Sequence, residues 1–375
     1  MEVQILSRKL IAPSSPTPPH LQNLKVSCFD QLAPSIYLPC IFYYPADGEN
    51  NEKRSKEMEK SLAETLSLFY PLGGRYIKDE FSVECNDMGA EFLEAKVGGF
   101  LSQLLEREER ESEMASHLVA PLFQAENSPL VIVQFNMFAC GGLAIGISIA
   151  HRIADAFTIG TFINAWATAC RIGSEKVHCR PSFQLGSLFP PKEMPSSSAT
   201  APGTDIKIIR RRFVFDGHTL SKLKAIARGG DSEQLVKHHP SRVEFMPDDE
   251  IKMELHHFVN RVHDAISTTT HDCAKASNSD DIYSMVSSKA REVGEALGEG
   301  NVDTYMFSCW CRFPWYEADF GWGKPSWVSS VDVPTGIVML MDTKDGDGIE
   351  VFLALDESSM LTLQQNLDKT ISFTG

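Results

Sequence analysis

A histidine and an aspartate four residues apart are the best candidates for chemistry in this chain. They lie in residues 148–157, which read S-I-A-H-R-I-A-D-A-F. A neutral imidazole near pH 7 can take a proton from a hydroxyl or amine while that group attacks a carbonyl carbon. His151 is therefore a candidate general base, and the alternative is a partly buried histidine bonded to the backbone. Asp155 has its own alternative, as the N-cap of the helix that follows.

Two strands and a helix are expected to position His151. Residues 130–150 carry no charge and are long enough to span a membrane as a helix. Their first part is β-branched and aromatic, Gly141 and Gly142 provide a turn, and large and small side chains then alternate, which predicts two paired, buried strands instead. From Phe157 to Cys170 large apolar residues recur at helical spacing. Polar groups on a turn between a strand and a helix can reach a cleft.

Two other local patterns are informative. Residues 50–69 predict an amphipathic helix whose apolar residues, including Met58 and Leu66, share one face. The phrase N-D-M-G at 86–89 is typical of a hairpin turn, and it lies between two strand-like runs, 76–85 and 91–97. We therefore expect those two runs to pair.

A second motif lies far along the chain, where residues 319–323 read D-F-G-W-G. The pair H-x-x-x-D and D-F-G-W-G, in this order, resembles the BAHD acyltransferases of plants, which move acyl groups from coenzyme A thioesters onto alcohols or amines. Condensation domains of peptide synthetases share the histidine-to-aspartate spacing and kinases share D-F-G. The two motifs together are specific to the BAHD family.

Further phrases extend the resemblance over nearly the whole chain. They are F-Y-P-L-G-G-R at 69–75, E-C-N-D-M-G at 84–89, C-G-G at 140–142 and P-S-R-V-E at 240–244. The phrases P-S-S-P-T-P at 13–18 and F-I-N-A-W at 162–166 look most like the alkaloid-acetylating, vinorine synthase-like branch.

The resemblance implies a two-domain α/β fold of the chloramphenicol acetyltransferase type, with mixed sheets and a channel between the halves. His151 would deprotonate the acceptor hydroxyl as it attacks the thioester, with no covalent acyl-enzyme. Asp155 and Asp319 would support the structure and would not transfer protons. Acetyl as the acyl group, and a plant specialised metabolite such as an alkaloid as the acceptor, also rest on the resemblance.

The D-F-G-W-G motif is expected on the coenzyme A side of that channel. Its residues Gly321, Trp322 and Gly323, together with Ser308, are the candidate contacts to coenzyme A. The indole N–H of Trp322 is also a candidate donor to the oxyanion that forms when the thioester is attacked.

Residues 181–203 are dense in proline and serine, which favours a linker near Pro190. We expect an N-terminal domain at 1–189 that carries H-x-x-x-D, a crossover linker at 190–205, and a C-terminal domain at 206–375 that carries D-F-G-W-G.

The resemblance is interrupted after Glu244. In family members the phrase P-S-R-V-E leads into a long apolar helix and then strands with an Asn-x-Arg phrase, whereas here F-M-P-D-D-E follows at once. We expect the second domain to be incomplete and to lack the arginine that pairs, in the family, with the aspartate of H-x-x-x-D. If Asp155 is buried without a partner, it would protonate, draw in water or find another cation. The competing hypothesis is an inactive truncated paralogue or splice product that acts as a binding protein.

The composition is that of a soluble enzyme. A chain of 375 residues with 43% hydrophobic content can bury a large core, and its formal charge of −15 argues against nucleic acid or membranes as partners. Nine cysteines without a C-x-x-C pair, and a start without a signal-peptide core, predict a cytoplasmic protein with reduced thiols. We expect a monomer with an acyl-CoA cosubstrate, a small alcohol or amine acceptor, and no bound cofactor.

Five histidines form a cluster that has to be weighed as a metal site. They are His238, His239, His256, His257 and His263. No H-E-x-x-H or zinc-finger spacing is present, so a structural or solvated role is favoured and no metal is expected. A serine nucleophile has even less support, because the chain has no G-x-S-x-G elbow.

Overall fold

A computed structural model describes residues 1–106, 114–120, 125, 127–192, 207–228, 255–276, 278–298, 304–331 and 333–372. The chain divides into two compact units, and each is described here by itself. Unit 1 consists of Met1–Glu193, Arg210–Arg212 and Ser308–Pro334, and unit 2 consists of Met194–Ile209, Phe213–Phe307 and Thr335–Gly375. The expected linker at 190–205 and the join after Glu244 lie largely or wholly outside the described residues.

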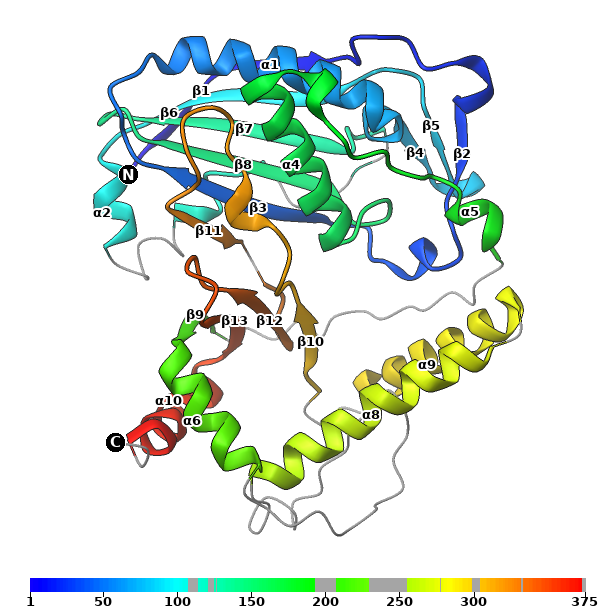
Figure 1. Ribbon diagram of the computed structural model, residues 1–375, viewed down its shortest axis with the longest axis vertical. Helices are drawn as coiled ribbons and strands as arrows, with labels where there is room; N and C mark the ends of the chain where they lie inside the picture. Colours follow the sequence, from blue (N-terminus) through cyan, green and yellow to red (C-terminus); the bar gives the residue numbers. More distant parts are fainter. Residues whose placement is uncertain are drawn as a thin grey trace. The chain divides into compact units, whose positions relative to one another are not determined.

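Unit 1 is built on a six-stranded mixed sheet with the strand order β1-β6-β7-β8-β3-β11 (Figure 1). Its strands are β1 (Val3–Ile11), β3 (Tyr37–Tyr44), β6 (Ala90–Val97), β7 (Val131–Phe138), β8 (Leu143–Ala150) and β11 (Trp327–Ser330). Strands β6 and β7 run parallel, and the other neighbours run antiparallel. A small sheet of β2 (Asn23–Lys25), β5 (Ser82–Glu84) and β4 (Arg75–Ile77) accompanies it.

The position of β11 corrects the expected domain assignment of D-F-G-W-G. Sequence analysis placed the motif in the C-terminal half, with the rest of residues 206–375. In the structure, β11 follows the motif and pairs antiparallel with β3, from Trp327 opposite Tyr43 to Ser330 opposite Cys40. Residues 308–334 therefore belong to unit 1.

The uncharged run at 130–150 forms two paired strands, as predicted. Strands β7 and β8 pair antiparallel through a turn in which Gly141 has a φ of +86°. The buried side chains of Gln134 and Asn136 donate hydrogen bonds to the backbone carbonyls of His117 and Leu118, at 2.8 and 2.9 Å. Buried amides are stable only when bonded, so these two contacts fix the segment at 114–120 on the sheet.

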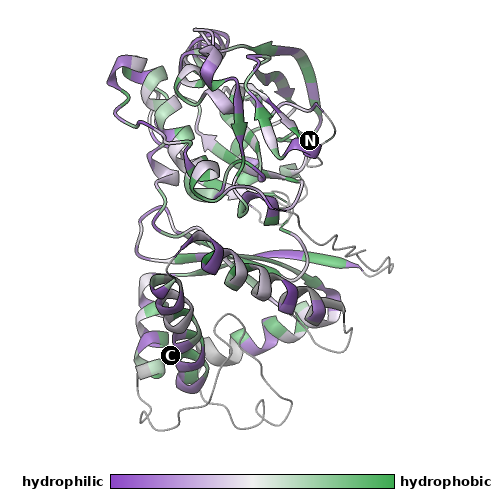
Figure 2. Cartoon of the chain, turned by 90° about the vertical axis from the view of Figure 1, so that its right-hand side faces the viewer, coloured by the Kyte–Doolittle hydropathy of each residue, from purple (hydrophilic) through white to green (hydrophobic). Residues whose placement is uncertain are grey.

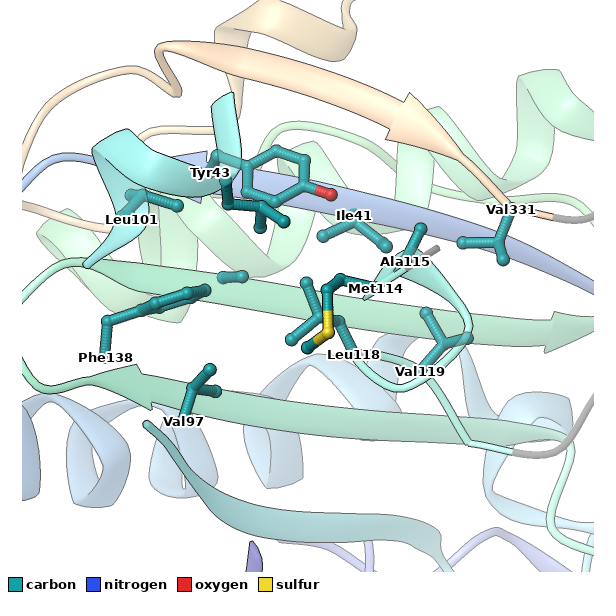
Figure 3. Packing of buried hydrophobic residues seen from close by; sticks show 12 residues of the cluster. Ile41, Tyr43, Val97, Leu101, Met114, Ala115, Leu118, Val119, Phe138 and Val331 are labelled. Carbon is teal, nitrogen blue, oxygen red and sulfur yellow. The ribbon is translucent and has the colours of Figure 1, made fainter. Parts of the chain in front are cut away.

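A glycine on β8 lets that segment lie directly on the strand. A Cβ atom on Gly146 would come within 2.1 Å of the Leu118 carbonyl oxygen, so no side chain fits there. The apolar side chains of the segment then close one face of the sheet (Figure 3). The members of this buried cluster are Ile41, Tyr43, Val97, Leu101, Leu104, Met114, Ala115, Leu118, Val119, Phe138, Ala144 and Val331.

Helices α1 (Asn51–Leu68) and α4 (Ala156–Ile172) cover the opposite face of the sheet (Figure 1). The predicted apolar face of α1 is confirmed, since Met58 and Leu66 are fully buried. The indole N–H of the buried Trp166 donates to the Met58 carbonyl at 3.1 Å and ties α4 to α1. The other α-helices in the described part of unit 1 are the short α2 (Leu101–Leu105) and α5 (Leu185–Leu188).

The predicted hairpin around 86–89 is wrong. The run at 76–85 splits into β4 and β5, because Phe81 takes a left-handed conformation with φ of +47°. Strand β5 then joins the small sheet, whereas β6 joins the large one. Asp87 instead binds across the chain, and its carboxylate accepts hydrogen bonds from the backbone and hydroxyl of Thr17 at 2.8 and 2.6 Å.

Unit 2 contains a four-stranded sheet with the order β10-β12-β13-β9. Its strands are β9 (Ile208–Phe215), β10 (Met306–Cys309), β12 (Ile337–Asp342) and β13 (Ile349–Asp356), and its helices are α6 (Gly217–Arg228), α8 (Leu255–Lys275), α9 (Ser279–Gly298) and α10 (Glu357–Ser372). Hydrophobic and hydrophilic residues alternate along these helices (Figure 2). None of the helices in the described part of the chain is long and apolar enough to cross a membrane.

Candidate active site

His151 follows the last residue of β8, on the turn that sequence analysis expected. Its backbone N–H donates to the Ile36 carbonyl at 2.9 Å, one step beyond the pairing of Ala150 with Tyr37. The backbone of His151 is therefore held by the sheet, while its side chain is only partly buried. An imidazole in this position is fixed at its base and can still be reached from outside.

The ring of His151 is oriented by a backbone carbonyl. Its Nδ1 atom lies 3.2 Å from the Ala154 carbonyl oxygen. A carbonyl oxygen can only accept, so the Nδ1 of a neutral ring must carry the proton. The Nε2 atom is then left with a lone pair, which is the form a general base needs.

Asp155 is the N-cap of α4 and is exposed. Its Oδ1 atom accepts a hydrogen bond from the Thr158 backbone N–H at 2.8 Å. This confirms the capping alternative, and because Asp155 is exposed the condition of a buried, unpaired carboxylate does not arise. Among the described residues Asp155 has no salt-bridge partner, which fits the expected loss of the arginine.

Two neighbours of the motif were not singled out from the sequence. The Nε of Arg152 donates to Ser35 Oγ at 2.5 Å, and its guanidinium lies 5.8 Å from the centre of the Tyr76 ring. Burial raises the pKa of Asp30, and the charge of Asp155 adds to that rise. The Asp30 carboxylate accepts hydrogen bonds from the Ser27 N–H and hydroxyl. A serine three residues before an aspartate is the sequence pattern that could have indicated this turn.

Asp319 organises the D-F-G-W-G turn. Its Oδ1 atom accepts from the backbone N–H groups of Gly321 and Gly323 at 2.8 and 3.0 Å, and its Oδ2 atom lies 3.3 Å from the Arg171 guanidinium at the end of α4. Gly321 and Gly323 have φ angles of +115° and +96°, which side-chain-bearing residues rarely adopt. These contacts fit a role for Asp319 in structure.

The aromatic residues of the turn anchor it on the sheet. Phe320 is buried, and its ring centre lies 5.0 Å from that of Trp166 and 6.4 Å from that of Tyr44. The Tyr44 hydroxyl also donates to the Ala318 carbonyl at 2.6 Å. The Arg54 guanidinium lies 4.9 Å from the Trp322 ring centre, in a cation–π contact.

Trp322 lies at the opposite end of β8 from His151, which contradicts its proposed role as oxyanion donor. The Trp322 ring centre is 6.1 Å from that of Tyr44, and Tyr44 pairs with Leu143 at the start of β8. From Leu143 to Ala150 a strand extends roughly 23 Å, at about 3.3 Å per residue. The Trp322 N–H is buried and has no hydrogen-bond partner among the described residues, and it is therefore beyond hydrogen-bond reach of a group held at His151.

Ser308 lies on β10 and its hydroxyl accepts a hydrogen bond from the Trp310 indole at 3.1 Å. The prediction that Ser308 and the two glycines of the turn contact coenzyme A stays a prediction. In the histidine cluster, His256 and His257 have ring centres 3.9 Å apart, and His238 and His239 lie outside the described residues. No group of three or more potential metal ligands occurs in the described ranges.

The α/β fold, with mixed sheets in two units, is that of the two-domain acyltransferases of the chloramphenicol acetyltransferase type. A sequence model described as the Transferase family matches residues 1–244 and 246–370. The chain belongs to this family, the BAHD acyltransferases. The match is interrupted at Phe245, where sequence analysis placed the missing segment.

Individual relatives agree with this assignment. Acetyl-CoA-benzylalcohol acetyltransferase from Clarkia breweri is 33% identical, with 98% of each chain covered, and stemmadenine O-acetyltransferase from Catharanthus roseus is 35% identical, with 96% of each covered. The crystal structure of vinorine synthase matches with a TM-score of 0.74 at 26% identity, over 96% of each chain. The alignment to the Clarkia enzyme has 427 positions against 375 residues here, so at least 52 positions carry no residue of this chain.

Proposed function

We propose that this protein transfers an acyl group, with acetyl as the first candidate, from a coenzyme A thioester to a hydroxyl of a plant specialised metabolite such as an alkaloid. The observation that carries the proposal is the bond from His151 Nδ1 to the Ala154 carbonyl, which leaves Nε2 as a base. The names of the relatives, which include acetyltransferases acting on benzyl alcohol and stemmadenine, support the acetyl group and the alcohol.

In the proposed reaction His151 Nε2 takes the proton of the acceptor hydroxyl. The acceptor oxygen attacks the thioester carbonyl carbon and forms a tetrahedral oxyanion. The carbon–sulfur bond then breaks, the ester is released, and the coenzyme A thiolate takes the proton back from the imidazolium. One residue thus serves as base and then as acid, and no bond between the enzyme and the acyl group is needed.

Direct transfer is supported by the protonation state of two thiols, one buried and one partly buried. Burial raises the pKa of Cys85 to about 12 and that of Cys170 to about 11. A thiol attacks as its thiolate, so these two side chains are poor nucleophiles at neutral pH. Among the described residues, we therefore assign the chemistry to His151 and not to these cysteines.

The second candidate function is that of a binding protein that has lost turnover. It is favoured by the interruption of the family match at Phe245 and by the lack of a basic partner for Asp155 among the described residues. We further propose a cytoplasmic monomer. The formal charge of −15 and the free cysteines among the described residues support this proposal.

Replacing His151 with alanine tests the proposed function. The His151→Ala variant should lose about two to four orders of magnitude in turnover, because the acceptor hydroxyl then has no base. Thiol release from acetyl-CoA with benzyl alcohol as acceptor is the measurement, and circular dichroism and melting temperature check the fold. A folded variant that keeps its turnover would exclude His151 as the base. A wild-type chain that binds acetyl-CoA without turnover would favour the binding protein.

A further inference from the structure

Unit 2 contains a pocket that the proposed reaction does not use. Its volume is about 640 Å³, within the range of about 300–1,000 Å³ that small-molecule sites occupy. Every residue that lines it belongs to unit 2, so it shares none with the His151 turn. The lining residues come from β9, β10, β12, β13, α10 and the residue before β10.

The floor of the pocket is an incompletely covered sheet face. Leu353 and Leu355 of β13 are buried, and they pack with Met360 of α10. Val338 and Leu340 of β12 line the same pocket but remain partly exposed. Helix α10 thus closes the β13 side of this face and leaves the β12 side open.

Aromatic side chains at the edge of the pocket are also exposed. Phe307 is 67% exposed and Tyr305 is 46% exposed, and both line the pocket. Moving apolar surface out of water lowers the free energy of the system. An apolar ligand that covers these rings would therefore bind favourably.

One wall of the pocket is polar and uncharged. Ser358 and Thr362 of α10 line it, and their hydroxyls already donate, to Asp356 Oδ1 at 2.5 Å and to the Ser358 carbonyl at 3.0 Å. A hydroxyl that has used its proton still has lone pairs that accept. This wall therefore fits a ligand that donates a hydrogen bond. Among the described residues that line the pocket, none carries a charge at neutral pH.

We propose that this pocket binds a neutral, largely apolar small molecule that bears a hydroxyl group. The apolar body lies on the sheet face and against Phe307, and the hydroxyl donates to Ser358 or Thr362. A second copy of the chain is a poorer occupant. A stable interface takes roughly 20–30 residues on each partner, whereas 15 residues line this pocket.

Fluorescence titration of the full chain with the neutral dye 1-N-phenylnaphthylamine tests the proposal. We expect one dye per chain, displaced by decanol at least about tenfold better than by decanoate, because the pocket provides no counter-charge for a carboxylate. Phe307→Asp should weaken dye binding at least about tenfold, since it places a charge in the apolar lining. Phe307 is largely exposed, so this change should leave the fold intact.

Two matched variants separate the pocket from other surfaces. Ile266→Asp alters a side chain of α8 that is 62% exposed and does not line the pocket, so it should leave dye binding unchanged. His151→Ala should also leave it unchanged, which separates this site from the proposed reaction. Equal dye affinity in Phe307→Asp and Ile266→Asp would overturn the proposal, as would equal competition by decanol and decanoate. A dimer in sedimentation that excludes the dye would assign the pocket to a second copy and would also overturn it.

Discussion

A backbone carbonyl, and not a carboxylate, holds the imidazole of His151. The Nδ1 proton is directed to the Ala154 oxygen at 3.2 Å, whereas the Asp155 carboxylate accepts from the Thr158 N–H at 2.8 Å. Asp155 is the N-cap of α4, and the short turn between β8 and α4 brings the Ala154 carbonyl to the His151 ring. The charge of Asp155 is therefore not needed to select the tautomer of His151.

Two substitutions of Asp155 separate capping from chemistry. Asparagine is as good an N-cap as aspartate, so Asp155→Asn should leave the melting temperature unchanged and should change turnover by less than about tenfold. Asp155→Ala removes the cap and should cost about 1 kcal/mol of stability. Chemical denaturation and thiol release from acetyl-CoA measure the two effects. If Asp155→Asn melts normally but is as inactive as His151→Ala, the carboxylate has a chemical role.

At the scale of elements, the turn at 319–323 is the junction between the end of α4 and the sheet. The Asp319 carboxylate bonds two backbone N–H groups of its own turn and the Arg171 guanidinium of α4. Phe320 packs on Trp166 of the same helix. The motif thus fixes where α4 ends relative to β3, at a distance from the turn that carries His151.

The loss of stability on substituting Asp319 should increase with the number of contacts that the substitution removes. Asp319→Asn keeps an acceptor for Gly321 and Gly323 and loses only a half-exposed ion pair, worth at most about 1 kcal/mol. Asp319→Ala also strands the two N–H groups and should cost about 1–2 kcal/mol.

Urea denaturation measures these stabilities, and Lys324→Gln is the control. Lys324 pairs with Glu317 beside the same turn, and both side chains are exposed. That change should therefore be nearly neutral. If Asp319→Asn abolished turnover with unchanged stability, a direct chemical role would be the better account.

At the scale of the whole molecule, the interruption of the family match falls between two helices of unit 2. Residues 244 and 246 lie between the end of α6 at Arg228 and the start of α8 at Leu255. The relatives have residues at positions where this chain has none.

Restoring the missing segment should raise both stability and turnover. We expect a chain with the corresponding segment of the Clarkia enzyme inserted after Glu244 to melt several degrees higher, since each 1 kcal/mol shifts the melting temperature by about 2–4 °C in a large domain. Turnover should rise by about two orders of magnitude, because misplacement of reacting groups costs a factor of that size.

An insertion of equal length rich in glycine and serine is the control for chain length alone. It should not raise the melting temperature, because it has no apolar face to bury. Equal melting temperatures and equal turnover for the native chain and the chain with the Clarkia segment would show that the missing segment is dispensable.

The sequence by itself determined the elements whose signal is local. Charge-free runs with β-branched residues specified β7 and β8, helical spacing specified α1 and α4, and Asp155 matched its role as an N-cap. The motif pair specified the family. These features depend on neighbours within one strand or one helical turn, which is why they can be predicted from the sequence.

Tertiary structure alone decided which strands pair and which motifs meet. The predicted hairpin at 86–89 does not form, because β5 pairs with β2 and β4 in the small sheet and β6 pairs with β1 and β7 in the large one. Strand β11 joins β3 across nearly 300 residues of chain, and this pairing carries Trp322 to the far end of β8 from His151. Such contacts arise from the burial of complementary faces between distant segments, and no local pattern of residues encodes them.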